Sequence, residues 1–261
     1  MTKKILIIAG SDSCGGAGLQ TDIKTASAHK VYSSAVVTCL TAQNTAGVYA
    51  IHNAPIPFLK KQLEVVLDDI KFDVIKTGML GEAAIIDCIY DVLQKKAKNI
   101  PLILDPVMVA TSSDILLKKT AIKSLKKLIS KATIVTPNID EAQVLAEMKI
   151  KNLADMKIAA KKIKDLGCKA VLLKGGHLNF ADKKIHSILL DENNKFYQIT
   201  NKKIGKKNIH GTGCALASAL ACNIAKKLAL KTAAQKANSY IFSAIKKSLK
   251  LGKGSLVLRH F

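Results

Sequence analysis

Short apolar runs alternate with longer stretches of helical periodicity along most of the chain. The apolar runs are rich in β-branched residues and have little polar alternation, which is typical of strands buried on both faces of a parallel sheet. We therefore expect strands at 3–9, 35–40, 74–77, 100–104, 133–136 and 170–174.

The segments between these runs carry helix spacing and helix boundary residues. Pro57 suits the first turn of a helix that runs to Ile70. Asn138 is placed to cap a helix starting at Ile139, and Glu141 follows it at capping-box spacing. Further helices are expected up to about residue 29, over 82–96, 118–130 and 152–166, after residue 214 and over 231–250, with a hairpin over 185–190 and 195–200.

Strands that alternate with helices predict an α/β fold with a mostly parallel, doubly wound sheet flanked by helices. The chain contains no glycine-, serine- or proline-rich linker, so we expect a single domain over residues 1–261. In such folds ligands bind beyond the carboxyl ends of the strands. Polar residues follow several of the predicted strands and should gather on that rim: Asp12, Gln43, Asp105, Asn138, Glu141 and Lys174.

The turn His210-Gly211-Thr212-Gly213-Cys214 precedes an uninterrupted run of helix formers. The first amides of a helix have no carbonyl partners within it, and glycines let an anion approach them closely. A Gly-x-Gly before an apolar helix is more often a plain connection, so the turn is a candidate phosphate cradle only in the company of the rim residues. The glycine-dense run 10–22 lacks the Gly-Lys-Ser/Thr ending of a P-loop, and Thr21 stands where a dinucleotide loop has its third glycine.

The net charge of +22 raises the possibility of a nucleic-acid partner. Only Arg259 among 41 basic residues is an arginine, and the chain has no Trp, so bidentate base contacts and stacking platforms are scarce. Most lysines recur along predicted helices as solvated faces. We expect no nucleic-acid partner and a field that attracts anionic substrates.

The six cysteines show no Cys-x-x-Cys pair and no metal-site spacing. The apolar run after Lys3-Lys4 is too short for a signal peptide or a bilayer span. These features predict a reduced, cytoplasmic protein without a membrane partner.

The rim has the parts that phosphoryl transfer needs, because this chemistry depends on positioning and charge stabilisation. Lys174 could span phosphates, although a lysine at a strand end is commonplace. Asn138 and Glu141 could order Mg²⁺ through water, and helix capping explains the same pair equally well. Asp105 could close a turn before a proline, and Gln43 offers both a donor and an acceptor to a heterocyclic ring.

Eight motifs in register give the chain a resemblance to the hydroxymethylpyrimidine/phosphomethylpyrimidine kinases of thiamine biosynthesis, a branch of the ribokinase-like superfamily. Each motif alone is weak, but together they cover nearly the full length. The motifs are the run 10–22, Ala42-Gln43-Asn44-Thr45, Lys76-Thr77-Gly78-Met79-Leu80, Asp105-Pro106-Val107-Met108, Thr136-Pro137-Asn138 with Glu141-Ala142, Leu173-Lys174-Gly175-Gly176-His177, 210–214 and Gly252-Lys253-Gly254.

The resemblance implies a three-layer α/β/α fold and an ATP- and Mg²⁺-dependent kinase that forms a homodimer. It places the pyrimidine among residues of the first half of the chain, which are Gly10, Asp22, Gln43, Met79 and Val107. It gives magnesium and phosphates to Asp105, Asn138 and Glu141, the transferring phosphate to Lys174, and the anion hole to Gly211, Thr212, Gly213 and Cys214.

The chain departs from the family pattern in two places. Thr111-Ser112-Ser113 stands where the family usually has Lys-Ser-Gly, which puts a phosphate contact or a loop shape in doubt. The region 183–208 matches poorly, and the adenine pocket is left unassigned.

Cys214 stands where ribokinase relatives have an aspartate base. A carboxylate about 4 Å from a substrate phosphate would cost about 4 kcal/mol at an effective dielectric near 20. A thiol avoids that repulsion and can ionise at a helix N-terminus. We hypothesise that Cys214 is a mild base in a first transfer and neutral in a second.

Three other functions compete with this interpretation. A pyridoxal kinase, or an enzyme with both activities, would share the glycine turn, but Gln43 and Met79 favour a pyrimidine. A nucleic-acid-binding module would depend on the lysines. A dinucleotide oxidoreductase is disfavoured by the missing third glycine.

Overall fold

A nine-stranded sheet forms the centre of the computed structural model, which describes residues 2–108, 116–176, 178, 182, 184–205 and 208–261. The strand order is β3-β2-β1-β4-β5-β6-β7-β8-β9. Neighbouring strands from β2 to β7 are parallel, while β3, β8 and β9 add antiparallel edges. The strands are β1 Lys4–Asp12, β2 Tyr32–Gln43, β3 Val48–Asn53, β4 Val74–Thr77, β5 Leu102–Leu104, β6 Ile134–Val135, β7 Ala170–Leu173, β8 Lys184–Leu190 and β9 Phe196–Lys202.

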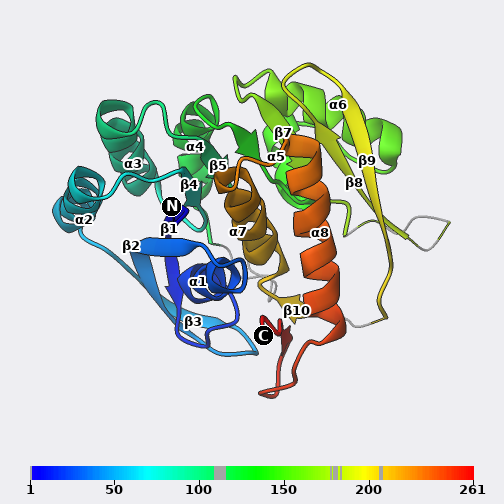
Figure 1. Ribbon diagram of the computed structural model, residues 1–261, viewed down its shortest axis with the longest axis horizontal. Coiled ribbons are helices and arrows are strands. Elements are labelled where there is room, and N and C mark those ends of the chain that lie inside the picture. The colour runs from blue at the N-terminus through cyan, green and yellow to red at the C-terminus, as the bar shows by residue number, and fades with distance from the viewer. Residues whose placement is uncertain (1, 109–115, 177, 179–181, 183, 206–207) are drawn as a thin grey trace.

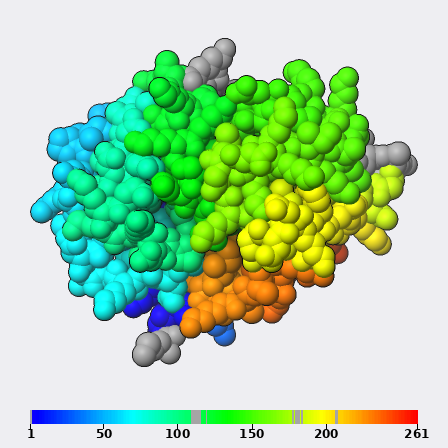
Figure 2. All heavy atoms as spheres, turned by 90° about the horizontal axis from the view of Figure 1, so that it is seen from above, coloured from blue at the N-terminus to red at the C-terminus, as the bar shows by residue number. Residues whose placement is uncertain are grey.

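Helices cover both faces of the sheet and give three layers, as Figure 1 shows. Helices α1, α7 and α8 pack on one face, and α2 to α6 pack on the other. Figure 2 shows these two layers from above, with the orange α7 and α8 region on one side and the cyan to green α2–α6 region on the other. The helices are α1 Gly18–Ala28, α2 Ile56–Asp69, α3 Ala83–Lys96, α4 Ile122–Ile129, α5 Ile139–Ala146, α6 Leu153–Lys164, α7 Thr212–Ala225 and α8 Leu230–Lys246.

Strand β1 shows how the sequence produces the two cores. Ile5 and Ile7 belong to the apolar cluster beneath α1, α7 and α8, whereas Leu6 and Ile8 belong to the cluster beneath α2 to α6. Successive strand side chains point to opposite faces, so a strand covered on both sides must be apolar at every position. The continuous apolar runs of the sequence therefore correspond to the central strands, as predicted.

The predicted secondary structure is wrong at the β2 edge and at a small second sheet. Strand β2 extends to Gln43, beyond the predicted end at residue 40, and a short turn leads from it into β3, which was not predicted. Two further short strands, β10 Ile209–His210 and β11 Leu256–Val257, pair in parallel apart from the main sheet. Their two-residue length leaves no periodic signal.

Helix α7 is buried around most of its circumference because it is built from alanine and other small residues. Ala217, Ala219 and Ala221 are each fully buried between the sheet, α1 and α8. Small side chains let the helix axis approach its neighbours closely. The N-terminus of α7 is therefore held at a fixed position over the sheet.

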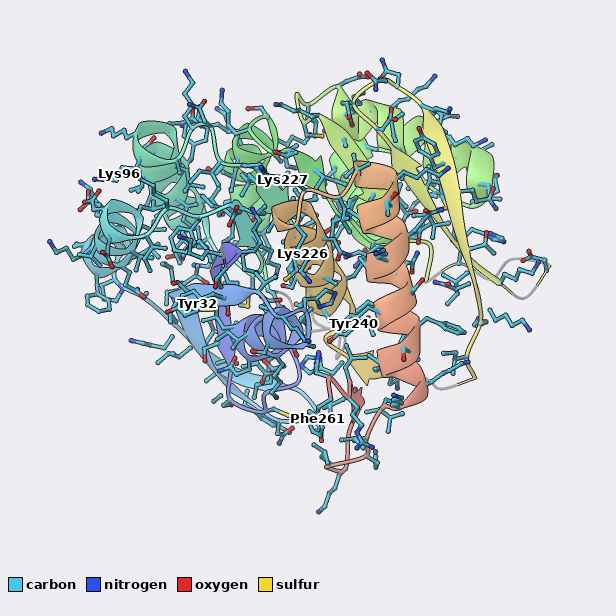
Figure 3. All side chains as sticks on the ribbon, viewed as in Figure 1. Tyr32, Lys96, Lys226, Lys227, Tyr240 and Phe261 are labelled. Atoms are coloured by element: carbon cyan, nitrogen blue, oxygen red, sulfur yellow. The ribbon has the colours of Figure 1, made fainter. Side chains whose placement is uncertain are left out.

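The C-terminal segment ties two parts of this rim together. The amides of Gly254 and Ser255 donate to the side chain and the carbonyl of Thr45, in the turn between β2 and β3. Strand β11 then pairs with β10, which leads directly into α7. Before this segment, Tyr240 of α8, labelled in Figure 3, lies against His29 at the end of α1, with ring centroids 4.5 Å apart.

Many of the lysines lie at exposed helix positions, for example Lys157, Lys161 and Lys162 of α6. Of the lysines labelled in Figure 3, Lys96 ends α3, while Lys226 and Lys227 lie in the turn after α7. This arrangement agrees with the solvated helix faces inferred from their spacing. No helix in the described part of the chain is both long enough and apolar enough to cross a membrane.

Candidate active site

A cavity of about 730 Å³ lies at the carboxyl ends of the parallel strands. Every candidate residue from the sequence except Asp22 lines it. The last residues of β1 and β2, residues that follow β4 and β5, and the first turn of α7 all line it. The convergence on one rim that the strand ends predicted is therefore present. The lining candidates are Gly10, Gln43, Met79, Asp105, Val107, Asn138, Glu141, Lys174, Gly211, Thr212, Gly213 and Cys214.

Two glycines at the start of α7 leave the backbone bare, with different consequences. Gly211 has a φ of +80°, and a Cβ on it would overlap the carbonyl oxygen of Gly16. Gly213 has no such backbone restriction, but a Cβ there would lie 3.2 Å from Lys174 Nζ and 3.8 Å from Asp105 Oδ2. The bare backbone at Gly213 thus opens the first turn of α7 towards a lysine and a carboxylate, which is the geometry of an anion site.

Lys174 and Asp105 form a buried ion pair at the floor of the cavity. Lys174 Nζ lies 2.9 Å from Asp105 Oδ1, which also accepts a hydrogen bond from the Thr136 hydroxyl. Burial alone would lower the pKa of Lys174, but Asp105 and Glu141 outweigh it and raise that pKa. The ammonium group is therefore charged, and Asp105 Oδ2 faces the start of α7.

Asn138 and Glu141 form the capping box that their spacing predicted. The Asn138 side chain accepts from the Glu141 amide at 2.9 Å, and the Glu141 side chain accepts from the Asn138 amide at 2.8 Å. Burial, with Asp105 nearby, raises the pKa of Glu141 to about 7 against the opposing pull of Lys174. The site thus holds two close carboxylates with one ammonium group between them.

One part of the cavity, which we call the heterocycle slot, is lined by Gly10, Gln43, Met79 and Val107. A Cβ on Gly10 would lie 2.7 Å from Cys39 Sγ and 3.3 Å from Met79 Sδ, so only glycine fits against these two side chains. Gln43 lies at the end of β2. An apolar lining with one amide suits a small heterocycle.

Asp22 does not line the cavity, which corrects the expectation that it lies around the pyrimidine. It is fully buried on α1 beneath the floor, where its carboxylate lies 2.6 Å from Lys76 Nζ and accepts from the Ser218 hydroxyl at 2.7 Å. Burial would lower the pKa of Lys76, but Asp22 raises it. This pair puts a second buried ammonium group under the start of α7.

Cys214 lies at the cavity wall in the first turn of α7. Burial raises the pKa of its thiol to about 12, against the lowering effect of Lys76. In the free site, desolvation and the neighbouring carboxylates therefore outweigh the groups that lower the pKa of this thiol.

The sequence analysis placed Asp12 on the rim and His210 in the glycine turn, but it missed their contact and one wall of the cavity. His210 Nε2 lies 3.1 Å from Asp12 Oδ2, and both residues line the cavity. A third wall comes from β8, β9 and α8, including Ser187, Asn201 and Phe242. This wall was missed because β8 and β9 lie in the region that matches the family poorly. The helix predicted over 231–250 carries no motif that indicates binding. His177 and the 111–113 departure lie outside the described residues.

Solved structures share this fold over the whole chain. A pyridoxal kinase from Staphylococcus aureus in complex with AMP-PCP and pyridoxal superposes with a TM-score of 0.90 at 33% identity, over 100% of this chain and 94% of the other. A phosphomethylpyrimidine kinase from Clostridium difficile superposes with a TM-score of 0.83 at 40% identity, over 94% and 100%. Fold and site together define a phosphotransferase with the ribokinase-like fold.

Sequence comparison then gives the family. Phosphomethylpyrimidine kinase is the family that matches residues 12–259, and the chain belongs to it. A hydroxymethylpyrimidine/phosphomethylpyrimidine kinase from Haemophilus influenzae is 38% identical over 99% of this chain and 97% of its own. The bifunctional thiamine biosynthesis protein ThiED of Geobacter sulfurreducens is 42% identical, and this chain spans 52% of its length. The family predicted from the eight motifs is thereby confirmed.

Replacing Glu141 with glutamine should stabilise the free protein above neutral pH. Because its pKa rises from an ordinary 4.5 to about 7 on folding, Glu141 favours the folded state most below pH 4.5, and this contribution is lost as the pH rises through 7. Glutamine stays neutral and keeps the capping box. Thermal melts should show a higher Tm for Glu141→Gln than for the unmodified chain at about pH 8 but not near pH 4.

Glu192→Gln, at an exposed position, is the matched control and should not alter the Tm at either pH. Equal Tm values for Glu141→Gln and the unmodified protein at the higher pH would show that burial of the ionised carboxylate does not destabilise the folded state.

Proposed function

We propose that this chain transfers the γ-phosphoryl group of ATP to the hydroxymethyl group of 4-amino-5-hydroxymethyl-2-methylpyrimidine and then to the resulting monophosphate. The observation that carries the proposal is one continuous cavity that contains a heterocycle slot, an anion turn and a lysine–carboxylate floor. The relatives named for both phosphorylations support the same substrate pair. Thiamine biosynthesis is the process in the name of the Geobacter relative.

ATP would bind with its phosphates at the start of α7 and its adenine against the third wall. The Staphylococcus aureus structure was determined with AMP-PCP, a nucleotide analogue, and shares the fold over the whole chain. The wall beyond the anion turn offers apolar side chains from α8 and amides that suit a purine, among them Asn201, Asn238, Ile241 and Phe242. Lys174 lines the same cavity beside Gly213 at the start of α7, where the transferred phosphoryl group would pass.

The residues on the floor fit a magnesium ion. Burial beside Asp105 raises the pKa of Glu141, so Lys174 alone does not compensate the negative charge of the two carboxylates. A divalent cation would supply the missing positive charge. Mg²⁺ commonly binds proteins through one or two carboxylates with waters and phosphates. Asp105 and Glu141 would hold it, while the Asn138 oxygen already accepts one hydrogen bond and would act through water. When bound, the ion neutralises the charge on the phosphates.

The chain's own residues would position both transfers. In the first, the substrate hydroxyl oxygen forms a bond to the γ-phosphorus, the bond from that phosphorus to the bridging oxygen breaks, and ADP leaves. Lys174 and the amides of Gly211 to Gly213 stabilise the charge on the moving phosphoryl oxygens. In the second, an oxygen of the bound monophosphate attacks, and this dianion has no proton to lose.

Cys214 would accept the hydroxyl proton in the first transfer alone. With a thiol pKa near 12, only about one molecule in 10⁵ carries the thiolate at neutral pH, so the base would be weak. In the second transfer the neutral thiol lets an anionic monophosphate occupy the space beside it.

Pyridoxal is the second candidate substrate, because the Staphylococcus aureus kinase crystallised with pyridoxal has the higher TM-score of the two structures. The slot and the anion turn would admit a pyridine of the same size. The pyrimidine is preferred since relatives at 38% and 40% identity are named hydroxymethylpyrimidine/phosphomethylpyrimidine kinase.

Phosphorus NMR of reactions with MgATP tests the assignment. The protein should convert hydroxymethylpyrimidine to a monophosphate and, in a separate tube, the monophosphate to a diphosphate, each with one equivalent of ADP. Pyridoxal in a third tube measures the alternative. Phosphorylation of pyridoxal with neither pyrimidine product would overturn the proposal.

The ratio of first to second transfer rates should depend on pH through Cys214. If the thiolate takes the hydroxyl proton, the first rate should rise about tenfold per pH unit above neutral while the second does not. Effects on nucleotide and metal binding are common to both reactions and cancel in the ratio. Cys214→Ala should make the ratio independent of pH, and Cys214→Asp should slow the second transfer more than the first.

A ratio that is already flat in the unmodified enzyme, or equal loss of both steps in Cys214→Asp, would show that Cys214 has no such role.

We also propose a homodimer formed through the β3 edge of the sheet. Among the described strands β3 pairs with β2 alone, and its central residues are exposed, with Tyr49 at 69% and Ile51 at 42%. A second copy in antiparallel register would cover them. Light scattering should give twice the chain mass of 28.0 kDa, and Tyr49→Glu with Ile51→Glu should give the single mass. A single mass for the unmodified protein would contradict the dimer.

The cytoplasmic location, the single domain and the lack of a nucleic-acid partner stay predictions from composition.

A further inference from the structure

His210 connects the two ends of the candidate active site. It ends β10, directly before Gly211, and its side chain is buried under the substrate end of the cavity. Its Nε2 atom lies 3.1 Å from Asp12 Oδ2 and 2.8 Å from the side-chain nitrogen of Gln43. One imidazole nitrogen therefore contacts both the glycine run and the amide that faces the heterocycle slot.

Asp12 determines which atom of His210 carries a proton. Its carboxylate accepts from the amides of Cys14, Gly16 and Ala17, and it is buried. Burial would raise the pKa of Asp12, but the bonds from His210 and these amides lower it, so the group is ionised. An ionised carboxylate only accepts, and two lone pairs facing each other repel. His210 Nε2 must therefore carry hydrogen.

Thr41 gives independent information about Gln43. The Thr41 hydroxyl lies 2.9 Å from the carbonyl oxygen of Ser11 and 3.1 Å from Gln43 Oε1. A hydroxyl has one proton, and the Ser11 carbonyl takes it. The Gln43 atom next to Thr41 must then be a donor, which is the amide nitrogen. A half turn of the Gln43 amide satisfies Thr41, and it also removes a donor–donor contact, because it places an oxygen beside the Nε2–H that His210 directs towards Asp12.

We propose that Asp12 and His210 fix the polarity of Gln43, with its oxygen towards His210 and its nitrogen towards Thr41. His210 is then a positioning residue that acts through Gln43. The second lone pair of the Gln43 oxygen and the second N–H of its nitrogen then face the slot. The oxygen is the nearer of the two to His210.

This polarity determines how the substrate lies, and the step rests on the proposed function. The aminopyrimidine has an amino donor next to a ring-nitrogen acceptor, and the two pair with the oxygen and the nitrogen of Gln43. The amino group then lies on the His210 side. Since the hydroxymethyl group occupies the ring carbon adjacent to the amino-bearing one, it points towards Gly211 and the anion turn.

In the same orientation, pyridoxal would present an acceptor where the aminopyrimidine presents a donor. Its formyl oxygen, an acceptor, takes the place of the amino group and would face the Gln43 oxygen. An unpaired acceptor in a buried site discriminates strongly between ligands of similar shape. The fixed amide thus selects aminopyrimidine over pyridoxal.

Imidazole ¹⁵N NMR of the substrate-free protein tests the protonation directly. The neutral Nε2–H tautomer and the imidazolium ion both carry the required proton, so either spectrum agrees with the proposal. A neutral Nδ1–H tautomer of His210 would overturn it. Asp12→Asn should shift His210 towards that Nδ1–H form.

Kinetic selectivity provides the second test, as the ratio of kcat/KM for hydroxymethylpyrimidine to that for pyridoxal. His210→Met keeps the volume but removes the donor, and should lower the ratio by about tenfold or more. His210→Gln places an amide nitrogen where Nε2 stood and should restore the ratio. Equal losses for both substrates in His210→Met would show a merely structural residue and overturn the proposal.

The two tests separate this inference from the function. If NMR detects the Nε2 proton of His210 but the protein does not phosphorylate the pyrimidine, the proposed function is overturned and the hydrogen-bond assignment remains. Pyrimidine phosphorylation by a protein with the Nδ1–H tautomer would do the reverse. Thermal melts of all variants show whether each is folded.

Discussion

A row of buried, alternating charges under the first turn of α7 is the interaction on which the site depends. Asp22 pairs with Lys76, Asp105 pairs with Lys174, and Glu141 lies beyond. Breaking one member of a buried pair is strongly unfavourable, so each residue fixes the next. The helix N-terminus above this row adds its own positive end. The two ammonium groups and this helix end favour a phosphate at the first turn of α7, and the carboxylates hold the ammonium groups in place.

Neighbouring residues hold these charged groups in place and leave room for them. Alanines let α7 lie close to the sheet, and Ser218 on its second turn donates to Asp22. Glycines at 211 and 213 leave room for the Gly16 carbonyl and for Lys174. The substrate end is tied to the same turn by His210 and by the C-terminal segment at Thr45. Recognition of the ring and placement of the phosphate therefore share one framework.

The sequence predicts which residues gather on the rim, because their positions follow from the ends of the strands. The sequence does not predict the directions of their side chains. Asp105, Asn138 and Lys174 could be placed together because parallel strands finish on the same edge. Asp22 could not be placed, since its position on α1 faces Lys76 and not the cavity. Asp12 and His210 lie 198 positions apart, and no periodicity brings them together. The wall from α8 was missed because its residues resemble an ordinary amphipathic helix.

Nucleotide binding to Gly213→Ala tests the anion site most directly. The backbone of Gly213 is helical, so alanine should leave the Tm equal or higher, while its methyl group occupies the space beside Lys174. Calorimetry with Mg²⁺ should show AMP-PCP binding weakened by about tenfold or more, roughly 1.4 kcal/mol, and AMP binding unchanged because AMP lacks the outer phosphates. Equal affinity of both proteins for AMP-PCP would contradict the account.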